Sequence, residues 1–187
     1  MPSSFPPPAH DPAELAEADH MLFTTQRIGD IARAAYGSVA AMLQADRTGT
    51  ELMLRDLDDT CEDAHEALWA VAILTLERIG TAAEQGHHLD SEAMATDVIA
   101  RADVFAPDTT LAIRAAATRL DALRSGDLDA FAASSVGLEN LVSPFELLLG
   151  ALALLAAALA WGAATEDRAA DDVCRDLCTA AMMAIEP

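Results

Sequence analysis

The feature that most constrains the fold is an uncharged run near the C-terminus that begins with a helix cap. Ser143, Pro144 and Glu146 stand in the order of a capping box. In this motif the Ser hydroxyl accepts the N–H of the third helical residue, and the Glu carboxylate accepts the N–H of the cap. The arrangement predicts a helix over residues 144–164.

The length of this run allows two interpretations, a membrane span or a buried core helix. No charge occurs between Leu147 and Thr165, and a helix of that length approaches the thickness of a bilayer. Arg168 is the only nearby cation, however, and Trp161 has no paired aromatic anchor. Much of the run is alanine, which lets helix axes approach closely. We therefore expect a core helix and no association with membranes.

Composition extends this expectation to the whole chain. Its 187 residues suit one domain, and they are 52% hydrophobic but only 4% aromatic, which favours helices over strands. We predict an all-α fold, a single-domain bundle of about six or seven helices with the uncharged helix buried at its centre. Residues 1–11 are predicted to be a disordered proline-rich tail, and residues 12–187 the helical domain.

Apolar spacing and turn residues set the expected helix bounds. A long first helix begins at Pro12 and ends before Arg47, and its apolar pattern slips once near residues 24–26. A second helix is expected from Thr50 to Gly86. Its buried stripe is predicted to be Leu57, Cys61, Ala64, Leu68, Val71, Thr75 and Ile79.

Shorter helices are expected in the rest of the chain. Ser91 is the predicted cap of one that reaches about Phe105, and Asp108 starts another that ends near Ser125. The two remaining segments are predicted over residues 127–137 and about 165–185, and the last of them can run on from the uncharged helix without a break.

Charge and cysteine content limit partners and location. The 31 acidic and 11 basic residues give a formal charge of −20, which repels phosphate backbones, so direct nucleic-acid binding is not expected. The three cysteines make an odd count, and the start of the chain has no apolar secretory run. These features predict a cytoplasmic protein with reduced thiols.

One motif combines residue types that can bind a metal ion. Three histidines follow a glutamate by three residues, in the pairs Glu17 with His20, Glu62 with His65 and Glu84 with His87. On a helix this spacing places carboxylate and imidazole on one face, as in di-iron bundles. The third pair falls at an expected helix end. Divalent-metal ligands are therefore predicted at Glu62, His65, Glu17 and His20 as an alternative to a protein without cofactor.

No nucleophile elbow or phosphate-binding glycine loop occurs in the chain. We therefore expect a non-enzymatic, acidic interaction or regulatory module that is homo-oligomeric and binds itself or another protein. One alternative is a metal-binding bundle enzyme that uses the Glu-x-x-His pairs. A second is a carrier or sensor of a small apolar ligand, with soft walls at Met42, Met53, Trp69 and Trp161.

Overall fold

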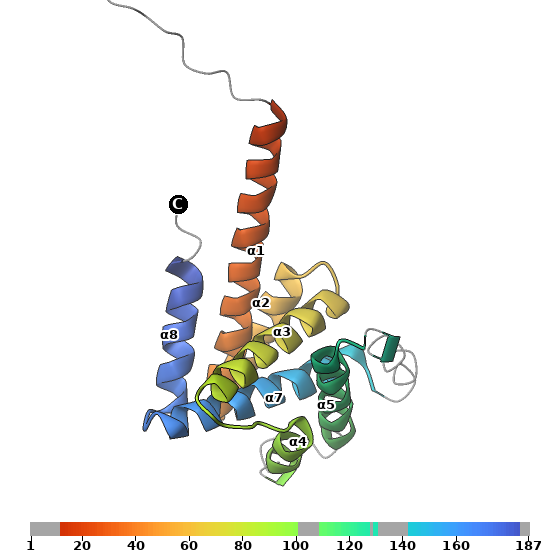
Figure 1. The fold of residues 1–187 in the computed structure, drawn as a ribbon, viewed down its shortest axis with the longest axis vertical. Helices are drawn as coiled ribbons and strands as arrows, with labels where there is room; N and C mark the ends of the chain where they lie inside the picture. Colours follow the sequence, from red (N-terminus) through yellow and green to blue (C-terminus); the bar gives the residue numbers. More distant parts are fainter. Residues whose placement is uncertain (1–11, 101–108, 128, 131–141, 184–187) are drawn as a thin grey trace, which may run out of the picture.

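The computed structural model describes residues 12–100, 109–127, 129–130 and 142–183, with side chains from Arg27 onward except that of His65. Within these residues the chain forms seven helices of at least ten residues and no strand (Figure 1). The all-α prediction is confirmed. The helices are α1 Pro12–Leu43, α2 Arg47–Thr60, α3 Ala64–Glu84, α4 Ser91–Ala100, α5 Thr109–Ser125, α7 Pro144–Thr165 and α8 Ala170–Met183.

Helix α7 begins as the capping box predicts. The Ser143 hydroxyl oxygen accepts the N–H of Glu146 at 3.2 Å. In return, the Glu146 carboxylate accepts the N–H and the hydroxyl of Ser143, each at 2.7 Å. Pro144 occupies the first turn, where its missing N–H costs no hydrogen bond. The helix ends at Thr165, one residue later than expected.

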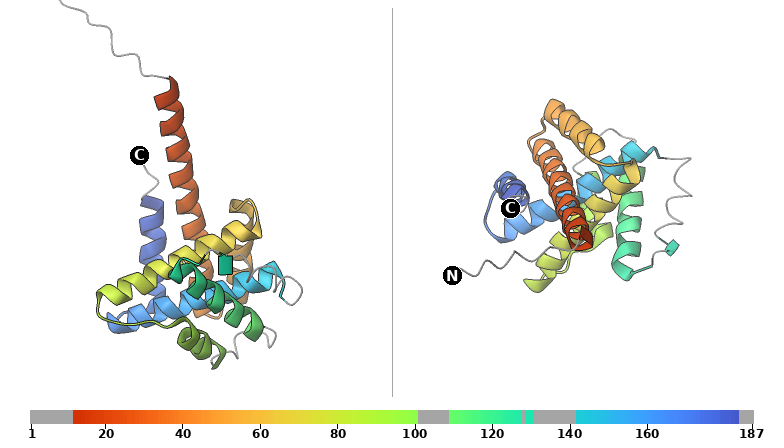
Figure 2. Two further views of the ribbon diagram at one scale, coloured as in Figure 1. Left: turned by 45° about the vertical axis from the view of Figure 1, so that its right-hand side comes forward. Right: turned by 90° about the horizontal axis from the view of Figure 1, so that it is seen from above.

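Helix α7 is the central element of the bundle. Leu152 and Leu155 are fully buried, and α3 and α5 pack along the helix (Figure 2). Helices α1 and α4 also contact it. At Gly150 the backbones of α7 and α5 approach so closely that an added Cβ would lie 2.6 Å from the carbonyl oxygen of Ala112. The prediction of a buried, closely packed Leu/Ala helix is therefore confirmed.

Among the described helices, α7 alone has the length and composition of a membrane span. Its most apolar window of 18 residues has a mean hydropathy of 2.2, and 61% of that window is buried inside the molecule. The apolar residues of α7 thus serve mainly to pack the helix within its own chain.

The helix predicted from Thr50 to Gly86 is in fact two helices. Helix α2 ends at Thr60, and Asp63 caps α3 by accepting the N–H of Glu66 at 2.9 Å. A short polar side chain that binds the backbone in this way competes with helix continuation, which explains the break. The predicted stripe is still buried from Leu57 to Ile79, except at the half-buried Ala64.

Other caps also differ from the predicted ones. Helix α2 starts at Arg47 rather than Thr50, because Asp46 accepts the N–H of Gly49 at 3.0 Å. Helix α4 is capped by Asp90, which accepts the N–H of Ala93, and not by Ser91. The buried Ser91 hydroxyl instead donates to Asp121 on α5 at 2.7 Å, and this bond joins the two helices.

Four helices end with the same backbone motif. The residue after the helix cap has a positive φ in each case, at Ala45, Gly86, Gly126 and Asp167. The next N–H then bonds back to a carbonyl five residues earlier, as in a Schellman motif. After Asp167 the chain turns before α8 begins at Ala170, so of the two arrangements that the sequence allowed, the structure has separate helices.

Helices α2 and α8 lie on different sides of α1 (Figure 2).

Several predictions fall outside the described residues. These are the tail over residues 1–11, the helical segment at 101–105, the start at Asp108 and most of the segment at 127–137.

Candidate functional site

The N-terminal half of α1 extends away from the bundle (Figures 1 and 2). Helix α1 is uninterrupted from Pro12 to Leu43, although the apolar pattern of its sequence slips near residues 24–26. Its C-terminal half packs against the other helices of the bundle. We call residues 12–26 the projecting segment, because Arg27 is the residue at which α1 meets the α2–α3 connection.

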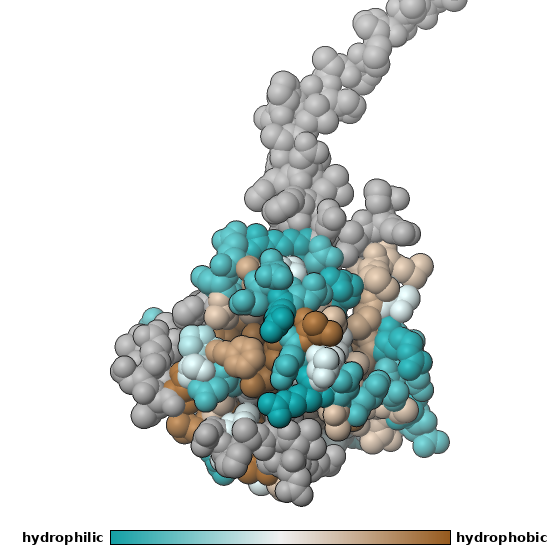
Figure 3. Space-filling view, turned by 180° about the vertical axis from the view of Figure 1, so that it is seen from behind, coloured by the Kyte–Doolittle hydropathy of each residue, from teal (hydrophilic) through white to brown (hydrophobic). Residues whose placement is uncertain are grey.

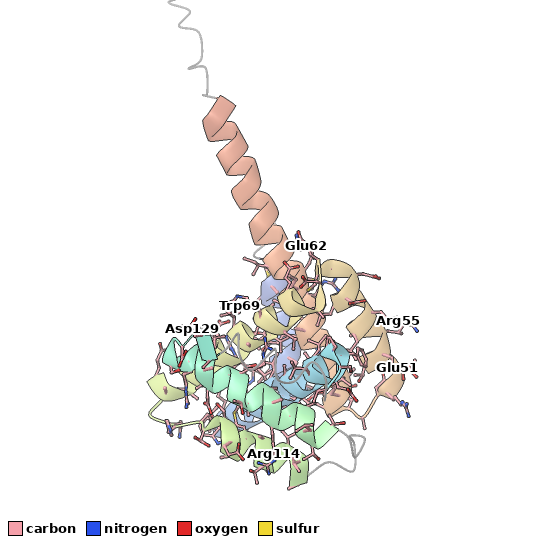
Figure 4. All side chains as sticks on the ribbon, turned by 90° about the vertical axis from the view of Figure 1, so that its right-hand side faces the viewer. Glu51, Arg55, Glu62, Trp69, Arg114 and Asp129 are labelled. Atoms are coloured by element: carbon pink, nitrogen blue, oxygen red, sulfur yellow. The ribbon has the colours of Figure 1, made fainter. Side chains whose placement is uncertain are left out.

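Arg27 joins the base of the projecting segment to the rest of the bundle. Its Nη1 lies 2.9 Å from Glu62 Oε1, and its Nη2 lies 2.5 Å from Glu66 Oε2. The Glu66 carboxylate also accepts the N–H of Glu62 at 2.5 Å. We call Arg27, Glu62, Asp63 and Glu66 the Arg27 cluster. Figure 4 shows Glu62 at the place where α1 leaves the bundle.

The Arg27 cluster combines a shielded cation with an exposed carboxylate. Hydrogen bonds to Glu62 and then to Glu66 raise the pKa of the Arg27 guanidinium, so this group stays charged. The Arg27 side chain is 23% exposed, whereas that of Glu62 is 79% exposed. Sequence reasoning missed this residue. The signal that could have found it is that Arg27 is the first Lys or Arg in the chain.

A second arginine fixes α1 two turns further along. The Arg33 Nη2 lies 3.0 Å from Asp56 Oδ2 on α2, and its Nε lies 4.0 Å from Asp30 on α1 itself. The Arg33 carbonyl oxygen also accepts the Cys178 thiol of α8 at 3.8 Å. Helices α2, α3 and α8 together therefore set the direction in which α1 leaves the bundle.

Exposed apolar side chains lie near this base. Ile28 follows Arg27 and is 62% exposed. Met182 and Met183 are 48% and 69% exposed at the end of α8, which lies beside α1 and ends on the side from which α1 projects (Figure 1). On the face shown in Figure 3, hydrophobic side chains form only small patches among hydrophilic ones. The base thus combines acidic groups with adaptable apolar groups.

The structure does not support the geometry assumed for the predicted metal site. The spacing of Glu62 and His65 requires both on one helix, but Glu62 precedes α3 and is bound to Arg27. The side chains of His65, Glu17 and His20 lie outside the described residues. Among described side chains, no three His, Cys, Asp or Glu residues are grouped to hold a metal ion. Metal binding remains a prediction, which elemental analysis of protein purified without chelator tests.

The predicted walls of an apolar ligand site occupy different environments. Met42 is buried in the core, and Met53 is half-buried where α1 faces α2 at Gly37. Trp161 packs edge-on against His87, with 4.8 Å between ring centroids, whereas Trp69 is 42% exposed. Ligand binding also remains a prediction, and native mass spectrometry of the purified chain tests it.

The three thiols are protected rather than activated. Burial raises the pKa of Cys61 to about 11 and that of Cys174 to about 12. The pKa of the half-buried Cys178 is also raised by burial. Because the thiolate is the reactive form, these cysteines behave as small apolar side chains of the core.

Comparison with protein-family models, with curated proteins and with solved structures finds no match to this chain. The functional proposal therefore rests on the geometry, burial and charge of the chain itself.

Proposed function

We propose that this protein is a non-enzymatic interaction module whose contact element is the projecting segment of α1. The observation that carries the proposal is that α1 continues as a helix beyond the described bundle. An isolated helix of about 15 residues is marginal in water, because its stability normally comes from packing an apolar face. A partner that covers this segment would supply that packing.

The base of the segment suits this role. The two arginines Arg27 and Arg33 tie α1 to α2 and α3 through carboxylates. A contact element held at one end by several ion pairs is pre-organised in direction, which lowers the entropy lost when a partner binds.

Self-association is part of the sequence-based expectation and stays a proposal. The alanine-rich surface of α7 offers little area for self-association, because most of it is used within the chain, where Ala153 and Ala158 are buried. Self-association through the projecting segment is the form that remains, and sedimentation at micromolar concentration measures it.

Site-specific photo-crosslinking tests the proposal. We would introduce benzoylphenylalanine at Leu22, in the projecting segment, and at the exposed Glu84 at the end of α3 as the matched control. The expected result is a discrete cross-linked species from position 22 in the source cells and none from position 84. Its mass distinguishes a second copy from another protein. Equal, diffuse labelling from both positions, together with a monomer in sedimentation, would overturn the proposal.

A further inference from the structure

Helix α8 lies at the edge of the bundle beside α1 and is attached to it by few buried side chains (Figures 1 and 2). It has 14 residues, of which only Cys174 is buried, whereas the ten residues of α4 include four buried ones. Its other inward side chains, Val173, Leu177, Cys178 and Ala181, are only partly buried where they pack against the core. The apolar area that holds α8 on the bundle is therefore small.

The charged side chains of α8 pair with near neighbours in the sequence. Arg168, just before the helix, pairs with Glu166 at 3.6 Å and also with Asp176. Arg175 pairs at 2.8 Å with Asp172, one turn away on the same helix. These ion pairs stay intact when α8 moves as a unit, so they do not hold it on α1.

Hydrogen bonds also attach and start α8 weakly. Among the described side chains, its one hydrogen bond to another helix runs from the Cys178 thiol to the carbonyl oxygen of Arg33 at 3.8 Å, and a thiol is a weak donor. The residue before its first turn is the exposed Ala169, which has no side-chain oxygen to cap the helix. Helices α2, α3, α4 and α7 each begin with an Asp or Ser cap. Away from the bundle, an uncapped helix of this length is marginal in water.

The packing at Cys174 links the position of α8 to the state of a thiol. Cys174 is 0% exposed, and burial keeps its thiol protonated. A side chain with no exposed area has no room for an added group while α8 lies on the bundle. A reagent therefore reaches Cys174 only after α8 opens, and the modified side chain prevents α8 from closing again.

We propose that α8 is a detachable latch, which leaves α1 and α7 as a unit while the other helices stay packed, and which small disulfides hold open by reacting with the uncovered Cys174. The Cys174 thiol first loses its proton to water, and the thiolate then attacks one sulfur of the disulfide. A new S–S bond joins Cys174 to one half of the reagent, and the other half leaves as a thiolate. A thiol reductant reverses the step. Opening uncovers the side of α1 that bears Tyr36, which interacts electrostatically with Cys174 in the closed state.

The labelling rates of individual thiols test the latch. In a Cys178→Ala chain, the first adduct on α8 forms at Cys174. The aromatic disulfide dithionitrobenzoate releases a coloured thiolate, and peptide mass spectrometry assigns the labelled cysteine. Static exposure favours Cys61, at 9%, over Cys174, at 0%. The latch reverses this order, and Cys174 should react at least about tenfold faster, because local opening costs less free energy than global unfolding.

Three substitutions in the same Cys178→Ala chain separate opening of α8 from global unfolding. Ala169→Ser supplies the missing cap and should slow the labelling of Cys174 about fivefold. Met183→Ala is the matched control on α8, because this side chain is 69% exposed, and it should leave the rate unchanged. Gly150→Ala overpacks α7 against α5, far from α8, and should also leave the labelling rate of Cys174 unchanged although it destabilises the whole fold.

Hydrogen exchange of the labelled chain shows which helices have opened. The amides of α8 should lose protection, whereas those of α3, α5 and α7 should keep it. Loss of protection throughout the labelled chain would overturn the latch, as would labelling of Cys174 no faster than that of Cys61. Acceleration of Cys174 labelling by Gly150→Ala to the full extent of the stability change would also contradict it, because Cys174 would then be reached only by global unfolding. The latch is independent of the projecting segment, whose test is the cross-linking at position 22.

Discussion

Gly150 of α7 faces the backbone of Ala112 on α5 at such close range that a Cβ on Gly150 would lie 2.6 Å from the carbonyl oxygen and 2.9 Å from the N of Ile113. No side chain fits there unless the two helices move apart. Gly162, in the same helix, has nothing within 4 Å of the equivalent position. These two glycines therefore form a matched pair for measuring how tightly the core is packed.

Gly150→Ala should lower the free energy of unfolding by about 1–3 kcal/mol, because overpacking displaces α5 from α7. Gly162→Ala should raise it by about 0.5–1 kcal/mol, since alanine loses less entropy in a helix. Urea denaturation followed by circular dichroism measures both values. If the two variants have equal stability, the close approach of α5 and α7 is wrong.

The four Schellman ends predict opposite effects at glycine and non-glycine positions. Gly86→Ala should destabilise the fold by about 1 kcal/mol, because φ there is +82° and a Cβ disfavours that region. Ala45→Gly, at φ +55°, should stabilise it by a comparable or smaller amount. Thermal unfolding of the two variants beside the wild type shows whether each substitution raises or lowers the stability. A loss of stability on Ala45→Gly would contradict the helix end described at Leu43.

The capping box makes stability depend on acid pH. Hydrogen bonds from the Ser143 hydroxyl and N–H lower the pKa of Glu146 below its ordinary value of 4.5. The contribution of the Glu146 carboxylate to the free energy of unfolding is therefore present above pH 4.5 and is lost as the pH falls through the lowered pKa. Glu146→Gln should flatten this part of the stability profile. Ser143→Ala should cost about 0.5–2 kcal/mol at neutral pH, and urea titrations at several pH values measure both effects.

Tyr36 provides a spectroscopic test of the core beside α1. It is the only tyrosine in the chain and is 3% exposed, and burial raises its pKa to about 12. Ultraviolet absorbance should therefore show ionisation near pH 12 rather than near the ordinary 10. Between these values only the unfolded chain loses the proton, so the free energy of unfolding should fall as the pH rises above 10. Ionisation near pH 10 in the folded protein would place Tyr36 outside the core.

Arg27 should control the order of the base of the projecting segment. Arg27→Ala removes both ion pairs and leaves Glu62 and Glu66 facing each other, so backbone amides near Ile28 should exchange hydrogen faster. Arg27→Lys should have a smaller effect, because a single ammonium does not form the same two-sided contact. Arg47→Ala is the control, since its side chain is 92% exposed beside Glu51. Equal exchange rates near Ile28 in all variants would show that the ion pairs of Arg27 do not order the base of the projecting segment.

Much of the fold follows from local signals in the sequence. The capping box at Ser143 is a local motif, so it predicts the start of α7 to the residue. The stripe from Leu57 to Ile79 also names buried positions correctly except at Ala64, because burial depends on helical spacing. The break within it was missed although its signal was local. Asp63 followed three residues later by Glu66 is a helix start, but it stands inside a continuous apolar pattern that suggested one helix.

The candidate site depended on the tertiary structure. Glu62 reads as a metal ligand in the sequence and is an ion-pair partner in the fold, because Arg27 lies 35 residues earlier and only helix packing brings them together. The slip in α1 was visible in the sequence, but its meaning was not. The structure shows that α1 continues through the slip as one helix from Pro12 to Leu43. The sequence by itself determined that the chain is helical, where α7 begins and most of the buried positions from Leu57 to Ile79, since these follow from spacing and hydrogen bonding along the chain. Only the tertiary structure decided that α7 is covered by its own chain and that the N-terminal half of α1 extends away from the other described helices.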